Sequence, residues 1–171
     1  MQRILIVGSG GAGKSTLSRR LSEILDIEVI HLDSLFWKPG WIESDPAEWQ
    51  KTLESIMSRD SWIIDGNYSR TLPKRLEACD TVVFLDLPRI VCLWGALKRV
   101  VRHYGRTRPD MPEGCPERFD FEFLRWIWNF PGATRQEVLA LLDTHRENRT
   151  VFQLRSRRDI ANFLSDAAER L

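Results

Sequence analysis

The sequence predicts a doubly wound α/β domain, in which helices cover both faces of a parallel sheet. Five short apolar runs, rich in Val and Ile, do not alternate with polar residues, which is typical of strands buried on both faces. Helical patterns occupy the segments between these runs. Alternating strands and helices give a parallel sheet when each crossover is right-handed.

The five apolar runs are the predicted strands, and they are residues 4–7, 27–32, 62–64, 81–87 and 150–154. The first predicted helix spans 14–25 and has one face rich in leucine. Asp45 is a good N-cap residue, and Pro46 suits the first helical position. We therefore expect a second helix that runs to about Arg59.

Pro88 precedes a third predicted helix, which runs to about His103. An aromatic-rich helix is expected at 119–130, where Pro131 ends it. The last two predicted helices each follow a hydroxyl side chain that is suited to cap them: Thr134 before 136–146 and Ser156 before 157–170.

The segment 103–116 has neither a helical nor a strand period, and it contains three prolines and two glycines. Long polar stretches inside compact domains are more often functional loops than core elements. We expect a mobile lid at about 103–120.

The composition predicts one folded domain over 1–171. It is 43% hydrophobic, which excludes intrinsic disorder as the main state, and its net charge of +1 argues against a protein that coats nucleic acid or a membrane. No run approaches the ~18 apolar residues of a membrane span, and no signal sequence is recognised. The three cysteines, without a Cys-x-x-Cys pair, favour neither disulfides nor zinc, so a cytoplasmic location is expected.

The turn after the first strand matches G-x-x-x-x-G-K-[ST] in full. Such a turn directs its backbone N–H groups at phosphate oxygens, and the following helix presents its positive end to the same anion. Lys14 is expected to reach the β- and γ-phosphates and Ser15 to ligate Mg²⁺. The predicted nucleotide-binding residues are Gly8, Ser9, Gly10, Gly11, Ala12, Gly13, Lys14, Ser15 and Thr16.

The strings typical of GTPases and of transporter ATPases are absent from the sequence. Instead, Asp65 ends an apolar strand and would lie beside the P-loop, where it could hold Mg²⁺ through water or simply cap a turn. Asp33 ends the second strand at the same edge. It could accept the proton of an attacking hydroxyl or serve as a turn residue.

A basic stretch without any acid lies between Pro88 and Pro109. Arg99 and Arg102 share a helix face, and Arg106 follows in the predicted lid. These arginines are candidates to stabilise the charge of a transferred phosphoryl group. The alternative is a solvated basic surface.

Three aromatic residues, Phe36, Trp37 and Trp41, flank a Lys-Pro-Gly turn after Asp33. They could stack on a base or planar ring of a phosphate acceptor. They could equally pack a small subdomain that has little core of its own.

These strings resemble adenylate kinase and its smaller relatives. Within that superfamily the sequence is most similar to bacterial kinase-like proteins labelled "DNA topology modulation protein". The resemblance covers nearly the whole chain and rests on the P-loop, the arginine helix and residues 31–33, 37–41, 63–71, 83–88 and 114–117.

The resemblance implies a five-stranded P-loop kinase fold, ATP with Mg²⁺, and an acceptor-binding segment at about 33–60. It also implies that Arg70 holds an acceptor phosphate and that Arg155 borders the adenine. The acid Asp33 departs from the adenylate kinase pattern and is more similar to kinases of nucleosides, gluconate and shikimate, whose acceptor is a hydroxyl.

The sequence therefore predicts phosphoryl transfer from ATP to a small acceptor by a monomer or homodimer. The alternative is a nucleotide-binding regulatory protein associated with DNA and without kinase turnover. That alternative predicts tight and steeply salt-dependent DNA binding, and the near-zero net charge argues against it.

Overall fold

The computed structural model describes residues 1–145 and 149–169. The strands are β1 (Arg3–Gly8), β2 (Val29–His31), β3 (Trp37–Lys38), β4 (Ile42–Glu43), β5 (Trp62–Asp65), β6 (Thr81–Leu85) and β7 (Thr150–Leu154). The helices are α1 (Lys14–Leu25), α2 (Leu32–Phe36), α3 (Pro46–Met57), the 3₁₀ helix η1 (Ser69–Thr71), α4 (Leu72–Ala78), α5 (Arg89–His103), α6 (Phe121–Asn129), α7 (Thr134–Thr144) and α8 (Arg157–Ala168).

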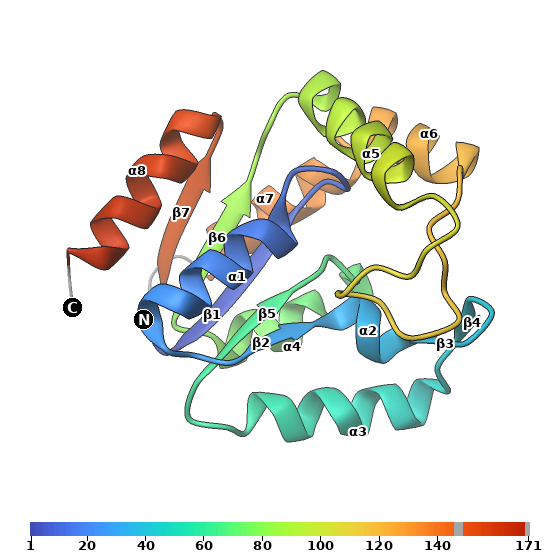
Figure 1. Cartoon of the computed structure of the whole chain (residues 1–171). Coiled ribbons are helices and arrows are strands. Elements are labelled where there is room, and N and C mark those ends of the chain that lie inside the picture. Colours follow the sequence, from blue (N-terminus) through green and yellow to red (C-terminus); the bar gives the residue numbers. More distant parts are fainter. Residues whose placement is uncertain (146–148, 170–171) are drawn as a thin grey trace.

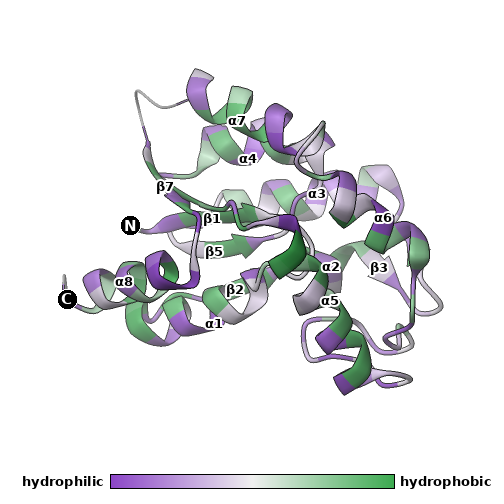
Figure 2. Ribbon diagram, turned by 90° about the horizontal axis from the view of Figure 1, so that it is seen from above, coloured by the Kyte–Doolittle hydropathy of each residue, from purple (hydrophilic) through white to green (hydrophobic). Residues whose placement is uncertain are grey.

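Five strands form one parallel sheet in the order β2-β5-β1-β6-β7 (Figure 1). Figure 2 shows α3, α4 and α7 on one face of the sheet, and α1 and α8 on the other. The predicted fold class, a three-layer α/β domain with a parallel sheet, is therefore confirmed. No helix among the described residues has the length and apolarity that a bilayer crossing requires.

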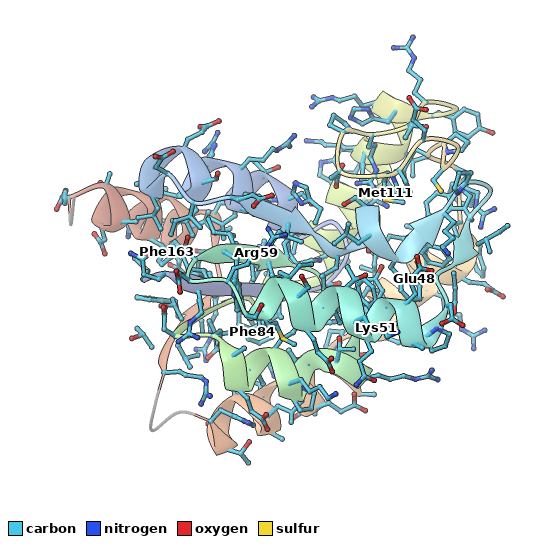
Figure 3. The ribbon with its side chains drawn as sticks, turned by 90° about the horizontal axis from the view of Figure 1, so that it is seen from below. Glu48, Lys51, Arg59, Phe84, Met111 and Phe163 are labelled. Carbon is cyan, nitrogen blue, oxygen red and sulfur yellow. The ribbon has the colours of Figure 1, made fainter. Side chains whose placement is uncertain are left out.

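The central strands are apolar throughout because both of their faces are buried. In β1, Leu5 and Val7 join the core under α3, α4 and α7, while Ile4 and Ile6 join the core under α1 and α8. Figure 3 labels one side chain from each core, Phe84 and Phe163. This double burial explains why the runs lack the polar alternation of a half-exposed strand.

The predicted strands 27–32 and 81–87 are shorter in the structure, where they are β2 (Val29–His31) and β6 (Thr81–Leu85). Each stops where its pairing with the adjacent strands stops. His31 pairs with Asp65, the last residue of β5, so the chain leaves the sheet there and Leu32 begins α2. Leu85 is likewise the last residue of β6 in register with β1 and β7. Apolar character continues beyond both strands because Leu32 and Leu87 remain buried.

Two of the predicted helix caps are confirmed and one is wrong. The side chain of Asp45 accepts hydrogen bonds from two amides of α3, and Ser156 forms a capping box with Asp159. Thr134 is not a cap, since α7 already begins at this residue and no side chain caps it. The predicted ends of the last two helices, at 146 and 170, lie outside the described residues.

Asp86, just after β6, ties three elements together at the carboxyl edge of the sheet. It accepts hydrogen bonds from Arg135 on α7 at 2.7 and 2.8 Å and from Gln153 on β7 at 2.7 Å. Burial acts to raise the pKa of Asp86, but these hydrogen bonds outweigh it and hold the pKa below its ordinary value. The interaction therefore stabilises the fold above about pH 4, the pKa of an unfolded Asp, and is lost as pH falls through the lower native pKa.

We expect Arg135→Ala to lower the free energy of unfolding by about 1 to 3 kcal/mol at neutral pH. The loss should shrink in acid, where Asp86 is protonated in both proteins. Urea unfolding at several pH values measures this difference, with the exposed Arg20→Ala as control. A loss of stability that does not depend on pH would contradict the role of this pair.

Candidate active site

The turn between β1 and α1 exposes a row of amides to the carboxyl edge of the sheet. No main-chain hydrogen bond engages the amides of Gly10, Gly11 and Gly13 within the described part of the chain. The Nζ atom of Lys14 donates to the carbonyls of Gly8 and Ser9, both at 3.0 Å. The turn is thus curled around the lysine, with N–H groups left for an anion.

Gly11 fits this turn because any side chain would collide with α5. Its φ is +71°, and a Cβ atom would lie 2.1 Å from the carbonyl oxygen of Cys92. Gly95 makes the reverse contact, since its Cβ would lie 2.2 Å from the carbonyl oxygen of Gly11. The two glycines let the phosphate-binding turn lie directly against α5.

Asp65 is the last residue of β5, at the same edge of the sheet as this turn, and is only 5% exposed. The Nδ1 atom of His31 is 3.0 Å from both of its carboxylate oxygens, and Ser18 donates to Oδ2 at 3.0 Å. Burial is the largest single effect and acts to lower the pKa of His31, but the hydrogen bond to Asp65 and the charges of Asp65 and Asp110 together outweigh it and raise the pKa. Asp65 is therefore oriented by partners from β2 and α1.

Lys14 and the two predicted carboxylates share one electrostatic environment. Burial is the largest effect on Lys14 and lowers its pKa, while Asp65 and Asp33 act in the opposite direction. A lysine that is partly stripped of water beside two acids needs further negative charge to be fully stabilised. Phosphate oxygens in the turn would supply it.

Asp33, on α2, is held by the segment that follows β5. The hydroxyl of Tyr68 donates to its Oδ1 at 2.6 Å. Burial first, and the Asp33 carboxylate second, raise the pKa of Tyr68 far above its ordinary value, so the phenol stays a donor.

The donor set suits Mg²⁺ as it is bound with a nucleotide. The Ser15 hydroxyl at the start of α1 and the Asp65 carboxylate are hard oxygen ligands of the kind Mg²⁺ prefers, and it usually takes the rest of its shell from water and substrate phosphates. Among the described residues no group of three or more His, Cys, Asp and Glu is arranged to hold a metal. Ser15 and Asp65 are the residues that would hold such an ion.

The predicted lid, residues 103–120, lies over the carboxyl edge of the sheet. Glu117, near the end of this segment, holds it in place through two arginines. Arg99 donates from Nε to Glu117 at 3.1 Å, and Arg108 pairs with the other carboxylate oxygen at 2.7 Å. The side chains of Arg108 and Glu117 are 10% and 4% exposed. Two guanidinium groups thus share one buried carboxylate.

The tip of the lid reaches the phosphate-binding turn and the acceptor segment. Asp110 pairs with Arg108 at 2.8 Å, and the Ser15 hydroxyl is among the neighbours that act on its carboxyl group. Burial acts to raise the pKa of Asp110, but Arg108 and Ser15 outweigh it and lower the pKa. Figures 1 and 3 both place the lid, with Met111 labelled in Figure 3, beside α2.

The lid also contacts the β3–β4 hairpin. The amide of Gly40 donates to the carbonyl of Gly114 at 2.9 Å, and the Cys115 thiol donates to the carbonyl of Lys38 at 3.2 Å. Cys115 is buried at this contact. The lid and the predicted acceptor segment therefore close over the sheet edge together.

The aromatic residues of the acceptor segment pack on one another and around Tyr68. Phe36 lies 4.8 Å from Tyr68 between ring centroids, and Trp37 lies 5.1 Å from Phe36. Trp41 contacts Trp37 at 5.6 Å and has the Arg118 guanidinium 5.2 Å from its ring. The packing interpretation holds for this set, and stacking on an acceptor stays a prediction.

Several predicted arginines lie outside this cluster. Arg70, Arg102 and Arg106 are exposed, and within the described residues their side chains form no hydrogen bond or ion pair. Arg155 is 4.0 Å from Asp86 with its side chain 69% exposed. Its neighbour Arg157 comes closer to the turn, with Nη1 at 3.4 Å from the carbonyl oxygen of Ala12.

Sequence reasoning assigned no role to several residues that the structure brings to the site, and they are His31, Tyr68, Arg75, Gly95, Asp110 and Glu117. His31 lies near the end of the predicted strand 27–32, and Tyr68 follows the predicted strand 62–64 by four residues. Closeness to a strand end is a signal that could have identified them. The roles of Glu117 and Arg75 depend on tertiary contacts and leave no local pattern.

Comparison with known proteins supports the fold. No family model and no curated protein matches the sequence. A solved structure of shikimate kinase from Bacteroides thetaiotaomicron matches with a TM-score of 0.53 and 18% identity over 99% of this chain and 97% of that chain. Shikimate kinase from Acinetobacter baumannii in complex with shikimate matches with a TM-score of 0.54 and 16% identity, over 99% and 92%. At these identities the similarity shows a shared three-layer α/β fold with a five-stranded parallel sheet.

Proposed function

We propose that this protein is an ATP- and Mg²⁺-dependent kinase that transfers the γ-phosphoryl group to a hydroxyl of a small acceptor. The observation that carries the proposal is the juxtaposition of Lys14, Asp65 and Asp33. A buried amine in a phosphate-binding turn lies in the field of two carboxylates at one sheet edge. Bound Mg²⁺, held by Ser15 and Asp65, would neutralise phosphate charge.

Each residue then has a definite role in the transfer. Asp33 accepts the proton of the acceptor hydroxyl while that oxygen forms a bond to the γ-phosphorus and the bond from phosphorus to the ADP oxygen breaks. The ammonium group of Lys14 binds the β- and γ-phosphate oxygens and stabilises the negative charge that they carry during the transfer. The lid arginines Arg99 and Arg108 stabilise the equatorial oxygens of the transferred group.

The acceptor is proposed to be a hydroxyl compound rather than a nucleoside monophosphate. Asp33 is held by a neutral phenol, which leaves its second carboxylate oxygen to receive a proton. Arg70, the residue expected to hold an acceptor phosphate, is exposed and unpaired in the described structure. The fold shared with two shikimate kinases supports this class.

An acceptor panel tests the proposal. ADP release is measured with Mg-ATP and, in turn, hydroxy acids, sugars, nucleosides and nucleoside monophosphates. We expect release that depends on a hydroxyl compound and needs Mg²⁺. Stimulation by nucleoside monophosphates alone would overturn the acceptor class, and no stimulation by any member of the panel would overturn the kinase assignment.

A comparison of Arg108 with Arg106 tests the lid. Arg108 is buried against Glu117 and Asp110, whereas Arg106 is exposed. Arg108→Ala should lower kcat by about tenfold to a hundredfold, with the KM for ATP changed far less. The reason is that the contacts of the lid arginines with the transferred phosphoryl group form fully only in the transition state. Arg106→Ala should change kcat by less than about twofold. Equal losses of kcat in the two variants would contradict the assignment of Arg108 as the lid arginine that acts in the transition state.

A further inference from the structure

Arg75, in α4, is a fully buried cation that no acid neutralises. Its exposed fraction is 0%, and within the described residues its guanidinium forms no ion pair. Burial lowers its pKa to about 9. Burying a charge without a carboxylate partner is costly, and an apolar side chain of similar size would pack at this place with less penalty. The position therefore calls for an explanation other than stability.

All but one of the guanidinium contacts go to three consecutive carbonyls of the segment after β5. Nη1 donates to Gly66 at 2.9 Å, and Nη2 donates to Asn67 and, at 3.0 Å, to Tyr68. The N–H at Nε donates to the Thr71 hydroxyl at 3.3 Å. One rigid, planar group thus fixes the orientation of three successive peptide units.

The same three residues touch both halves of the site. The Asn67 side chain accepts a hydrogen bond from the amide of Gly8 at 3.0 Å, which attaches the segment to the end of β1. The Tyr68 hydroxyl donates to Asp33 at 2.6 Å. The segment therefore connects the start of the phosphate-binding turn with the proposed base.

Tyr68 adopts a backbone conformation that it would not choose alone. Its φ is +38°, in the left-handed region that non-glycine residues rarely occupy. Such residues persist only where their surroundings hold them, and they concentrate at functional sites. Here the holding contacts are the bond from Arg75 to the Tyr68 carbonyl and the bond from the phenol to Asp33.

We propose that Arg75 is a positioning residue for phosphoryl transfer, which keeps Tyr68 in its strained conformation and thereby aims Asp33 at the acceptor hydroxyl. It touches neither ATP nor acceptor, and it acts only through the segment 66–68. The kinetic part of this inference rests on the proposed kinase function, whereas the structural part does not.

Nuclear magnetic resonance tests the structural part without any substrate. The chain has two tyrosines, Tyr68 and the exposed Tyr104, so carbon-13 at Cζ of tyrosine gives two resonances. In Arg75→Lys, the Tyr68 resonance should move toward that of Tyr104 as the hydrogen bond to Asp33 is lost. Arg149→Lys is the matched control, because Arg149 also donates to a main-chain carbonyl, that of Glu77 at 2.9 Å, and should leave the Tyr68 resonance in place.

The kinetic part uses the acceptor that the panel identifies. Arg75→Lys should lower kcat by about tenfold to a hundredfold with the KM for ATP within about threefold, because the phosphate-binding turn keeps its own contacts. Tyr68→Phe should cause a similar loss. If Arg75 acts through Tyr68, the double variant should be no slower than the slower single variant, whereas independent roles would multiply the losses.

The outcomes separate this inference from the kinase assignment. A Tyr68 resonance that moves in Arg75→Lys but not in Arg149→Lys supports the positioning role even if no acceptor is found. A resonance that stays in place, a multiplicative double variant, or equal effects of both arginine variants would overturn it. An Arg75→Lys protein that does not fold would also overturn it, because the guanidinium would then serve the whole fold.

Discussion

Replacing Lys14 by alanine is expected to lower kcat about a thousandfold or more while the protein stays folded. The reason is that, in the part of the chain that the structure describes, the amine of Lys14 donates only to two carbonyls of its own turn and lies in the field of Asp65 and Asp33. Its charge is therefore used fully only when phosphate oxygens enter. The loss of a partly desolvated cation costs the empty protein little. Steady-state kinetics and thermal unfolding of the same preparations measure the two effects.

The control for this variant is Lys74→Ala, on the exposed surface of α4. Lys74 lies outside the acceptor-binding segment, and its variant should keep wild-type turnover. A Lys14→Ala protein with turnover close to that of the control would contradict the role of the turn in phosphoryl transfer. A large drop in its melting temperature would show that the lysine is part of the scaffold instead.

Replacing Asp33 by asparagine is expected to lower kcat about a hundredfold to ten-thousandfold. Asparagine keeps the shape of the side chain and an oxygen that accepts the Tyr68 hydroxyl, so the aromatic cluster around Tyr68 should be preserved. Only the ability to take a proton is removed. The KM for ATP should stay within about threefold, because the nucleotide is held by the turn after β1.

Asp166→Asn, on the exposed surface of α8, is the matched control for this substitution. If Asp33→Asn retained a substantial fraction of wild-type turnover, Asp33 would be a turn residue, which is the alternative that the sequence leaves open. A loss confined to the KM for the acceptor would assign Asp33 to binding rather than to proton transfer.

The layers of the fold were predictable because burial on both faces leaves a strong local signal. The strands and α1 follow directly from apolar runs and from one leucine-rich face. The short helix α4 was not predicted, because seven residues give too little of a helical period, and the β3–β4 hairpin was not predicted because its strands have two residues each. Both elements depend on contacts with distant segments.

Functional side chains of the candidate site could be predicted where they directly follow the end of a strand. They could not be predicted where tertiary contacts alone bring them to the site. The turn with Lys14, and the acids Asp33 and Asp65, could be placed at one edge because parallel strands end together. The lid arginines could be identified only as a group, since Glu117 decides which of them turn inward. Arg75 resembles its exposed neighbour Lys74 in sequence, and only packing distinguishes them.

The central claim is that the phosphate-binding turn delivers a phosphoryl group to an acceptor hydroxyl. The most direct measurement follows label from ATP labelled in its γ-phosphate, in the presence of Mg²⁺ and a hydroxyl compound. We expect the label to appear in the acceptor, and Lys14→Ala and Asp33→Asn each to suppress this transfer. Label that appears only in inorganic phosphate, at a rate that no acceptor changes, would contradict it.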